Sequence, residues 1–134
     1  DLLAEVQASE DAAIERRQLE AAATAAQRGE IALTRLRYRE AAGHFAAAAR
    51  KVPPGHEEQS LAYLTREASA LYQQGDEFGD NPALASAIDR YSALLKRRSR
   101  DRAPLEWAAT QNNLGFALLR AILHLPARLL GSKA

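Results

Sequence analysis

Glycine and proline residues divide this chain into five stretches that are each long enough for a helix. These residue types are the strongest local breakers of secondary structure, and here they gather at Gly29, Pro53 to Gly55, Gly75, Gly79 to Pro82, Pro104, Gly115, Pro126 and Gly131. The stretches between them predict helices over 38–51, 56–74, 82–98 and from Pro104 onward, after a first stretch of about 1–37 that forms one long helix or two joined near Gly29. Short connections favour an antiparallel array.

The composition favours helix at nearly every position. The 134 residues include 30 Ala and 19 Leu, but Val, Ile and Thr together number only 10. Ala and Leu lose little side-chain freedom in a helix, and an apolar content of 47% allows one domain with a sizeable core. We therefore predict an all-α fold, an antiparallel array of helix hairpins with a long N-terminal helix.

Charge and residue types exclude several classes of function. The formal net charge is +1, so no overall field attracts nucleic acid or an acidic membrane, and no apolar run approaches the roughly 18 residues of a membrane span. The chain has no Cys, which excludes disulfides, a thiolate nucleophile and Cys-ligated zinc. We expect a soluble, cytoplasmic protein with no nucleic-acid or membrane partner. Because the chain starts at Asp1 without a signal peptide, we also expect it to be part of a longer protein.

A glycine, an alanine twelve residues later and an aromatic residue four after that occur twice. The two sets are Gly29, Ala41 and Phe45, and Gly75, Ala87 and Tyr91. A lone Gly in a helix costs about 1 kcal/mol relative to Ala, so its recurrence indicates a recurring need. Small residues let two helix backbones pack closely, and the aromatic side chain then fills the space beside the hairpin.

This pattern resembles the tetratricopeptide repeat (TPR), a helix–turn–helix unit of about 34 residues that stacks into a right-handed superhelix. In that family Gly stands at position 8 of the unit, Ala at 20, an aromatic residue at 24, Ala at 27 and Pro at 32. The first unit of this chain fills these positions with Gly29, Ala41, Phe45, Ala48 and Pro53. The second unit fills the first three, and the third has Asn112 to Gly115 before Pro126 interrupts its second helix.

The spacing departs from the family's period. The three glycines lie 46 and 40 residues apart, against a period of about 34, which predicts an irregular superhelix. We divide the chain into an N-terminal helical extension, residues 1–21, about two and a half TPR-like units, residues 22–125, and a C-terminal tail, residues 126–134. Segments 33–45 and 91–119 are also similar to the Ala- and Arg-rich repeat arrays of large bacterial proteins.

The resemblance implies a concave surface lined by the first helix of each unit. The partner-binding residues implied at those positions are Glu30, Tyr72, Gln73, Asp76, Asn112, Asn113, Phe116 and Arg120, with Thr34 and Ser69 also on this lining. Amide side chains offer donors and acceptors together and can bracket an extended peptide. Packing between helices is the alternative role of Tyr72 and Phe116. Some members of the family grip the C-terminal carboxylate of a partner peptide, but this chain lacks the residues of that clamp. The acidic Glu30 and Asp76 favour a basic or neutral partner.

No pattern indicates catalysis, a metal or a cofactor. His44, His56 and His124 lack the mutual spacing of metal ligands, and the chain has neither a G-x-S-x-G motif nor a Gly-rich phosphate loop. Residues 96–102 include five basic side chains. Contact with phosphates is one interpretation of this run, but we favour a structural role, because cations at a helix C-terminus complement the helix dipole.

These observations predict a non-catalytic protein–protein interaction module, without cofactor or metal, that holds a peptide or helix of a partner protein in its groove. The alternative is an element for self-assembly into a homo-oligomer. It would use the N-terminal helix together with an apolar C-terminal end, because an incomplete third unit leaves one helix face without cover. That end comprises Leu118, Leu119, Ile122, Leu123, Leu125, Leu129 and Leu130.

Overall fold

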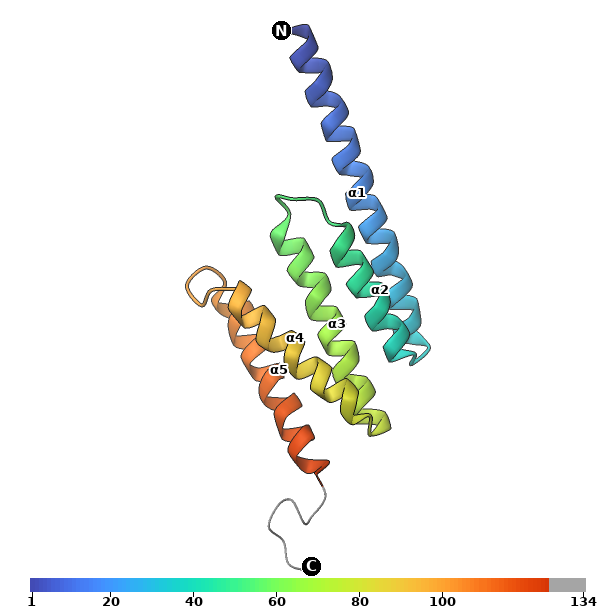
Figure 1. The fold of residues 1–134 in the computed structure, drawn as a ribbon, viewed down its shortest axis with the longest axis vertical. Helices are drawn as coiled ribbons and strands as arrows, with labels where there is room; N and C mark the ends of the chain where they lie inside the picture. The colour runs from blue at the N-terminus through green and yellow to red at the C-terminus, as the bar shows by residue number, and fades with distance from the viewer. Residues whose placement is uncertain (126–134) are drawn as a thin grey trace, which may run out of the picture. The chain divides into compact units, whose positions relative to one another are not determined.

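The computed structural model describes residues 1–125, which form five α-helices (Figure 1). They are α1 (Leu2–Thr34), α2 (Tyr38–Lys51), α3 (Glu57–Phe78), α4 (Asn81–Arg97) and α5 (Pro104–Leu123). The described residues contain no strand, so the predicted all-α class is confirmed. The predicted tail, residues 126–134, with its Pro126, Leu129 and Leu130, lies outside the described residues.

The chain divides into two compact units, residues 1–64 and 65–134, with the boundary inside α3. The first unit holds α1, α2 and the first turns of α3, and the second holds the rest of α3 together with α4 and α5. Across residues 1–125, no helix is both long and apolar enough to cross a membrane.

The first unit is built on the close approach of α1 and α2, which run side by side in opposite directions (Figure 1). α1 is one continuous helix of 33 residues, so Gly29 does not divide it. Its buried residues are Ala22, Ala25, Gly29 and Ala32, spaced three or four apart on one face. At Gly29 an added Cβ would lie only 2.9 Å from Cζ of Phe45. The glycine therefore makes room for the Phe45 ring, which is 1% exposed.

The second unit repeats this arrangement at Gly75. A Cβ there would lie 2.6 Å from Cδ2 of Leu84 and 3.1 Å from the carbonyl oxygen of Asp80. Of the two ends that the sequence allowed, at Gly75 or in the loop beyond it, the structure shows the later one, because α3 continues through this glycine to Phe78. The side chain of Asp80 caps α4 by accepting a hydrogen bond from the Ala83 N–H at 3.2 Å. The side chain nearest to Gly75 is thus Leu84, which lies about one helical turn before Ala87, the alanine of the repeated pattern.

α5 packs against α4 with only Thr110 and Ala117 fully buried. The third glycine of the repeated pattern, Gly115, has no neighbour of the kind found at Gly29 and Gly75, because an added Cβ would meet nothing within 4 Å. Among the described residues, the pairing of a glycine with a large side chain therefore occurs twice and not at α5.

The glycines provide a test of this packing by single substitutions. Gly75→Ala is expected to lower the free energy of unfolding by about 1–3 kcal/mol, because its methyl group overlaps the buried Leu84. Gly115→Ala adds the same methyl group to open space and is expected to raise stability by up to about 1 kcal/mol through better helix propensity. Urea unfolding of both variants measures the difference. Equal effects at the two positions would contradict the assigned packing.

Candidate functional site

The candidate site is built from two rows of side chains in the second unit. Residues four apart lie one above the other on a helix face. Tyr72 and Asp76 form such a row on α3, and Asn112, Phe116 and Arg120 form another on α5. The sequence pattern predicted that both rows line the concave surface, but it did not predict how close the two rows are to each other.

An ion pair brings the two rows together. Nε of Arg120 lies 2.6 Å from Oδ1 of Asp76, a short charge-assisted contact between α5 and α3. The side chains are 45% and 29% exposed respectively, so the pair contributes little net stability in water. The contact shows which faces of α3 and α5 lie next to each other. We call these two faces the α3–α5 surface.

The side chains of the α3–α5 surface differ in how far they reach solvent. Gln73 and Asn112 are exposed, and Phe116 is 51% exposed, which is high for a large apolar side chain. Tyr72 and Asn113 are half-buried. The surface therefore offers amides and an accessible aromatic ring beside a neutralised charge pair.

Two of the predicted lining residues, Glu30 and Thr34, belong to the first unit, and Ser69 forms a contact inside the second unit. Glu30 lies exposed on α1 in the other unit. The hydroxyl of Thr34 donates a hydrogen bond to the carbonyl oxygen of Ile31 at 2.7 Å. The hydroxyls of Ser69 and Tyr91 are 3.1 Å apart and hydrogen-bonded to each other, so Ser69 helps to hold α3 against α4.

The ion pair changes the electrostatic expectation for a partner. Asp76 was expected to favour a basic ligand, but its carboxylate is already matched by the Arg120 guanidinium. The sequence held one signal of this pairing, because Asp76 and Arg120 carry opposite charges at lining positions of consecutive units. A partner of neutral character fits the α3–α5 surface better than a basic one.

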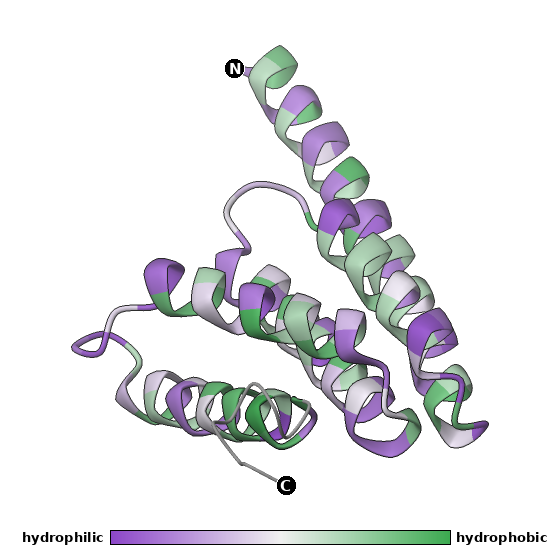
Figure 2. Cartoon of the chain, turned by 60° about the horizontal axis from the view of Figure 1, so that its bottom comes forward, coloured by the Kyte–Doolittle hydropathy of each residue, from purple (hydrophilic) through white to green (hydrophobic). Residues whose placement is uncertain are grey.

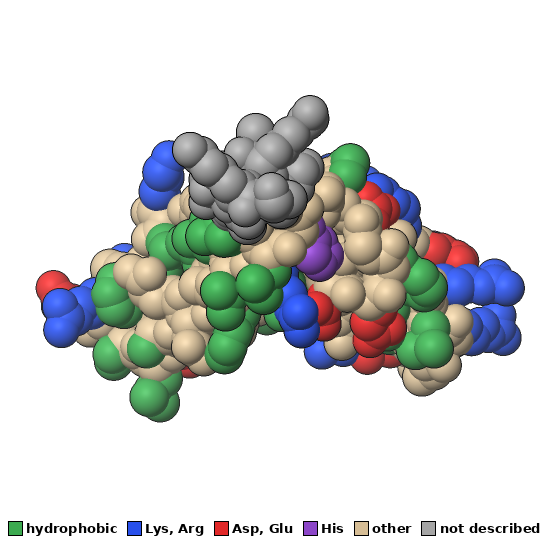
Figure 3. Space-filling view, turned by 90° about the horizontal axis from the view of Figure 1, so that it is seen from below, with side chains coloured by type: hydrophobic (Ala, Val, Ile, Leu, Met, Phe, Trp, Pro, Cys, Tyr) green, Lys and Arg blue, Asp and Glu red, His purple; other side chains and the backbone are tan. Residues whose placement is uncertain are grey.

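A second exposed feature is the apolar end of α5. Its large hydrophobic side chains are exposed at Leu118 (44%), Leu119 (52%), Ile122 (51%), Leu123 (59%) and Leu125 (43%). Figure 2 shows hydrophobic residues dominating the last turns of this helix. Figure 3 shows exposed hydrophobic side chains on the side of the view where α5 lies. Exposed apolar clusters of this kind are typical of interaction surfaces.

The histidines take part in pairwise contacts. Nε2 of His56 lies 2.5 Å from Oε1 of Glu15, Nε2 of His44 lies 3.8 Å from Oε1 of Glu40, and Nδ1 of His124 lies 2.8 Å from Oδ1 of Asn81. In the described part of the chain, no three His, Cys, Asp or Glu side chains are grouped as metal ligands.

The basic run after α4 makes local structural contacts. Lys96 and Arg97 lie in the last turn of α4, and the Arg100 guanidinium stacks over the Trp107 ring, 5.5 Å from its centroid. The hydroxyl of Ser99 accepts a hydrogen bond from the Arg102 N–H at 2.9 Å. These contacts favour the structural interpretation of the run over phosphate binding.

No known protein family, curated protein or solved structure matches the chain.

Tyr91 is expected to make stability depend on alkaline pH. Burial raises the pKa of its phenol above the ordinary 10.0, partly offset by the hydrogen bond from Ser69. As pH rises, the unfolded chain therefore loses the Tyr91 proton before the folded chain does. The free energy of unfolding keeps the full contribution of neutral Tyr91 below pH 10.0 and loses it as pH rises through the pKa of the folded protein. Urea unfolding measured as pH rises above 10.0 should show a smaller loss of unfolding free energy for Tyr91→Phe than for the native chain. An identical decline in both proteins would contradict the assignment.

Proposed function

We propose that this chain is a non-catalytic protein–protein interaction module that binds a peptide or helix of a partner protein on the α3–α5 surface. The proposal includes a TPR-like arrangement, in which α1 with α2 and α3 with α4 are successive helix hairpins and α5 is the first helix of a third. Two glycines at equivalent places in the first helices, each covered by a large side chain of the next helix, support this arrangement.

The Asp76–Arg120 contact is the observation that carries the proposal. Since it joins α3 to α5 at 2.6 Å, the exposed Gln73, Asn112 and Phe116 belong to helix faces that adjoin one another. An extended peptide needs hydrogen-bond partners for its backbone and an apolar contact for its side chains. Amides on two neighbouring helices supply the hydrogen bonds, and the Phe116 ring supplies the apolar contact.

The same surface gives no support to an enzymatic role. Its only charged groups, Asp76 and Arg120, are paired with each other, and general acid–base catalysis needs a group placed to exchange a proton with a substrate. We therefore propose a binding function without a catalytic residue, cofactor or metal.

Self-assembly is the second candidate function, and the exposed apolar side chains of α5 favour it. The first turns of α1 add Leu2 and Leu3, which are 75% and 81% exposed. In this alternative, copies of the chain bury these apolar ends against one another.

Affinity capture with two double variants tests the α3–α5 surface. Asn112→Ala with Phe116→Ala removes an amide and the accessible ring. Gln111→Ala with Lys96→Ala removes similar bulk from exposed positions outside the two rows. We expect partner proteins captured by the native chain to be lost by the first variant, with affinity lowered about tenfold or more, since central aromatic contacts dominate binding energy. The second variant should retain them.

Circular dichroism must first show that both variants keep the native helix content. Equal recovery of partners by the two variants would contradict binding at the α3–α5 surface. Recovery of a second copy of this chain alone, unchanged by either variant, would replace the proposal with self-assembly.

A further inference from the structure

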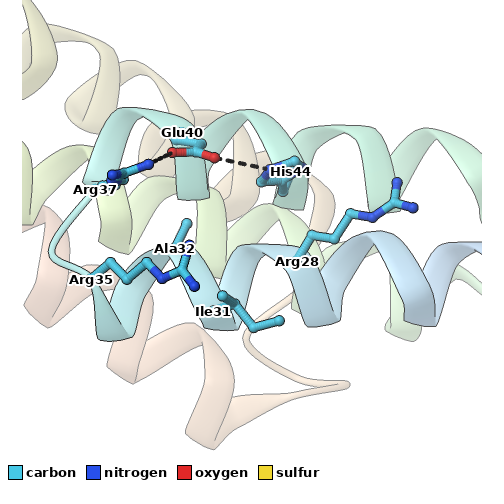
Figure 4. Close-up of a pocket in the computed structure, with 7 residues that line it drawn as sticks. All are labelled: Arg28, Ile31, Ala32, Arg35, Arg37, Glu40 and His44. Carbon is cyan, nitrogen blue, oxygen red and sulfur yellow. Dashed lines mark ion pairs between the residues drawn. The ribbon is translucent and has the colours of Figure 1, made fainter.

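A pocket of about 240 Å³ lies in the first unit, between the end of α1 and the start of α2. Figure 4 shows Arg28 and Arg35 extending on either side of Ile31. Glu40 and His44 project from α2. All of its lining residues belong to residues 1–64, so the pocket and the α3–α5 surface belong to different units.

The turn between α1 and α2 carries two of the three arginines, Arg35 and Arg37. Only three residues separate the helices, and Leu36 among them has a φ of +58°, a left-handed conformation that is unfavourable for a residue with a Cβ. The N–H groups of Arg35 and Arg37 both donate hydrogen bonds to the carbonyl oxygen of Ala32, at 3.1 and 2.9 Å. This capped turn holds Arg35 and Arg37 at the edge of one pocket.

The pocket is positively charged. Three guanidinium groups, those of Arg28, Arg35 and Arg37, face one carboxylate, that of Glu40, which leaves an excess of two positive charges when His44 is neutral. Glu40 lies 3.7 Å from Nη1 of Arg37 and 3.8 Å from Nε2 of His44, longer than hydrogen bonds. Among the described residues, the guanidinium groups of Arg28 and Arg35 make no side-chain hydrogen bond or ion pair.

Size and charge together select the ligand. The volume is below the range of about 300–1,000 Å³ typical of sites for drug-sized molecules, so it suits a single small group. A phosphate monoester carries about −1.5 to −2 charges at pH 7, which matches the excess, whereas a carboxylate carries only −1. Guanidinium forks pair with phosphate oxygens through two parallel hydrogen bonds.

We infer that the pocket formed by Arg28, Arg35, Arg37 and His44 binds a phosphate group, either free or as the monoester of a phosphorylated side chain. Arg28 and Arg35 hold its oxygens from α1, and Arg37 exchanges its long contact with Glu40 for the ligand. Ile31, which is 51% exposed, offers an apolar surface to the carbon atoms that carry a phosphoester.

Calorimetric titration of the whole chain tests this site with four probes. They are inorganic phosphate and the tripeptides Ala-phosphoSer-Ala, Ala-Ser-Ala and Ala-Glu-Ala. We expect the phosphopeptide to bind and the serine peptide not to bind, with the glutamate peptide at least tenfold weaker than the phosphopeptide. If the affinity for inorganic phosphate equals that for the phosphopeptide, the pocket is a site for free phosphate. If the affinity for the phosphopeptide is clearly higher, the ligand is a phosphorylated segment of a protein.

Three variants assign the binding to particular side chains. Arg28→Gln with Arg35→Gln is expected to weaken phosphate binding about tenfold or more, since it removes charge-assisted hydrogen bonds to the phosphate oxygens. Arg16→Gln with Arg17→Gln removes the same charge from exposed positions of α1 outside the pocket and should leave the affinity within about twofold, because charges at that distance are screened. Glu40→Gln should tighten binding, because it removes the competing carboxylate.

All four substituted arginines are exposed, and circular dichroism verifies that each variant is folded. The inference would be overturned if neither phosphate probe binds the native chain. Equal weakening by the two arginine pairs would likewise overturn it, since this would indicate attraction by overall charge. Equal affinity for the glutamate and phosphoserine peptides would show a general carboxylate site instead.

Discussion

The packing of both units depends on the close approach of a glycine in one helix to a large side chain in the next. Gly29 faces the ring of Phe45 and Gly75 faces Leu84, at distances that leave no room for a Cβ. Phe45 and Leu84 are among the largest fully buried side chains. Because a single glycine on each helix provides this space, it determines which face of α1 meets α2 and which face of α3 meets α4. The cost of glycine in a helix is thereby offset by burial of a large apolar side chain.

This register decides which side chains remain at the surface. With the Gly75 face of α3 turned toward α4, the row of Asp76 lies where Arg120 of α5 can reach it. The polar groups of the α3–α5 surface are therefore presented by rigid helices rather than by loops, which favours recognition with little loss of conformational entropy. In the first unit, a turn of three residues joins α1 to α2, and it carries Arg35 and Arg37 of the pocket. Both proposed binding regions follow from the way the helices pair.

The helical class and most helix boundaries could be predicted because they depend on local chemistry. Pro82 and Pro104 lie in the first turns of α4 and α5, as their fixed φ and missing N–H lead one to expect. The sequence left open whether α3 ends at Gly75 or in the loop beyond it, and the helix continues to Phe78, since a buried glycine is retained inside a helix when a neighbour needs its space. The pairing of Asp76 with Arg120 joins residues far apart in sequence, and the lining positions of the TPR resemblance indicated the two helices but not the contact. The turn that carries Arg35 and Arg37 of the pocket includes Leu36 in a left-handed conformation, which no residue preference of leucine indicates.

The glycine pairing can be measured directly in solution. Nuclear Overhauser effects report protons that lie within van der Waals contact, so spectra of the isotopically labelled chain can test both pairs at once. We expect strong effects between the Gly29 Hα protons and the Phe45 ring, and between the Gly75 Hα protons and the Leu84 methyl groups. We expect no comparable long-range effect from residues 1–125 to the Gly115 Hα protons. Absence of the first two effects in a chain with native helix content would contradict the register on which both binding proposals depend.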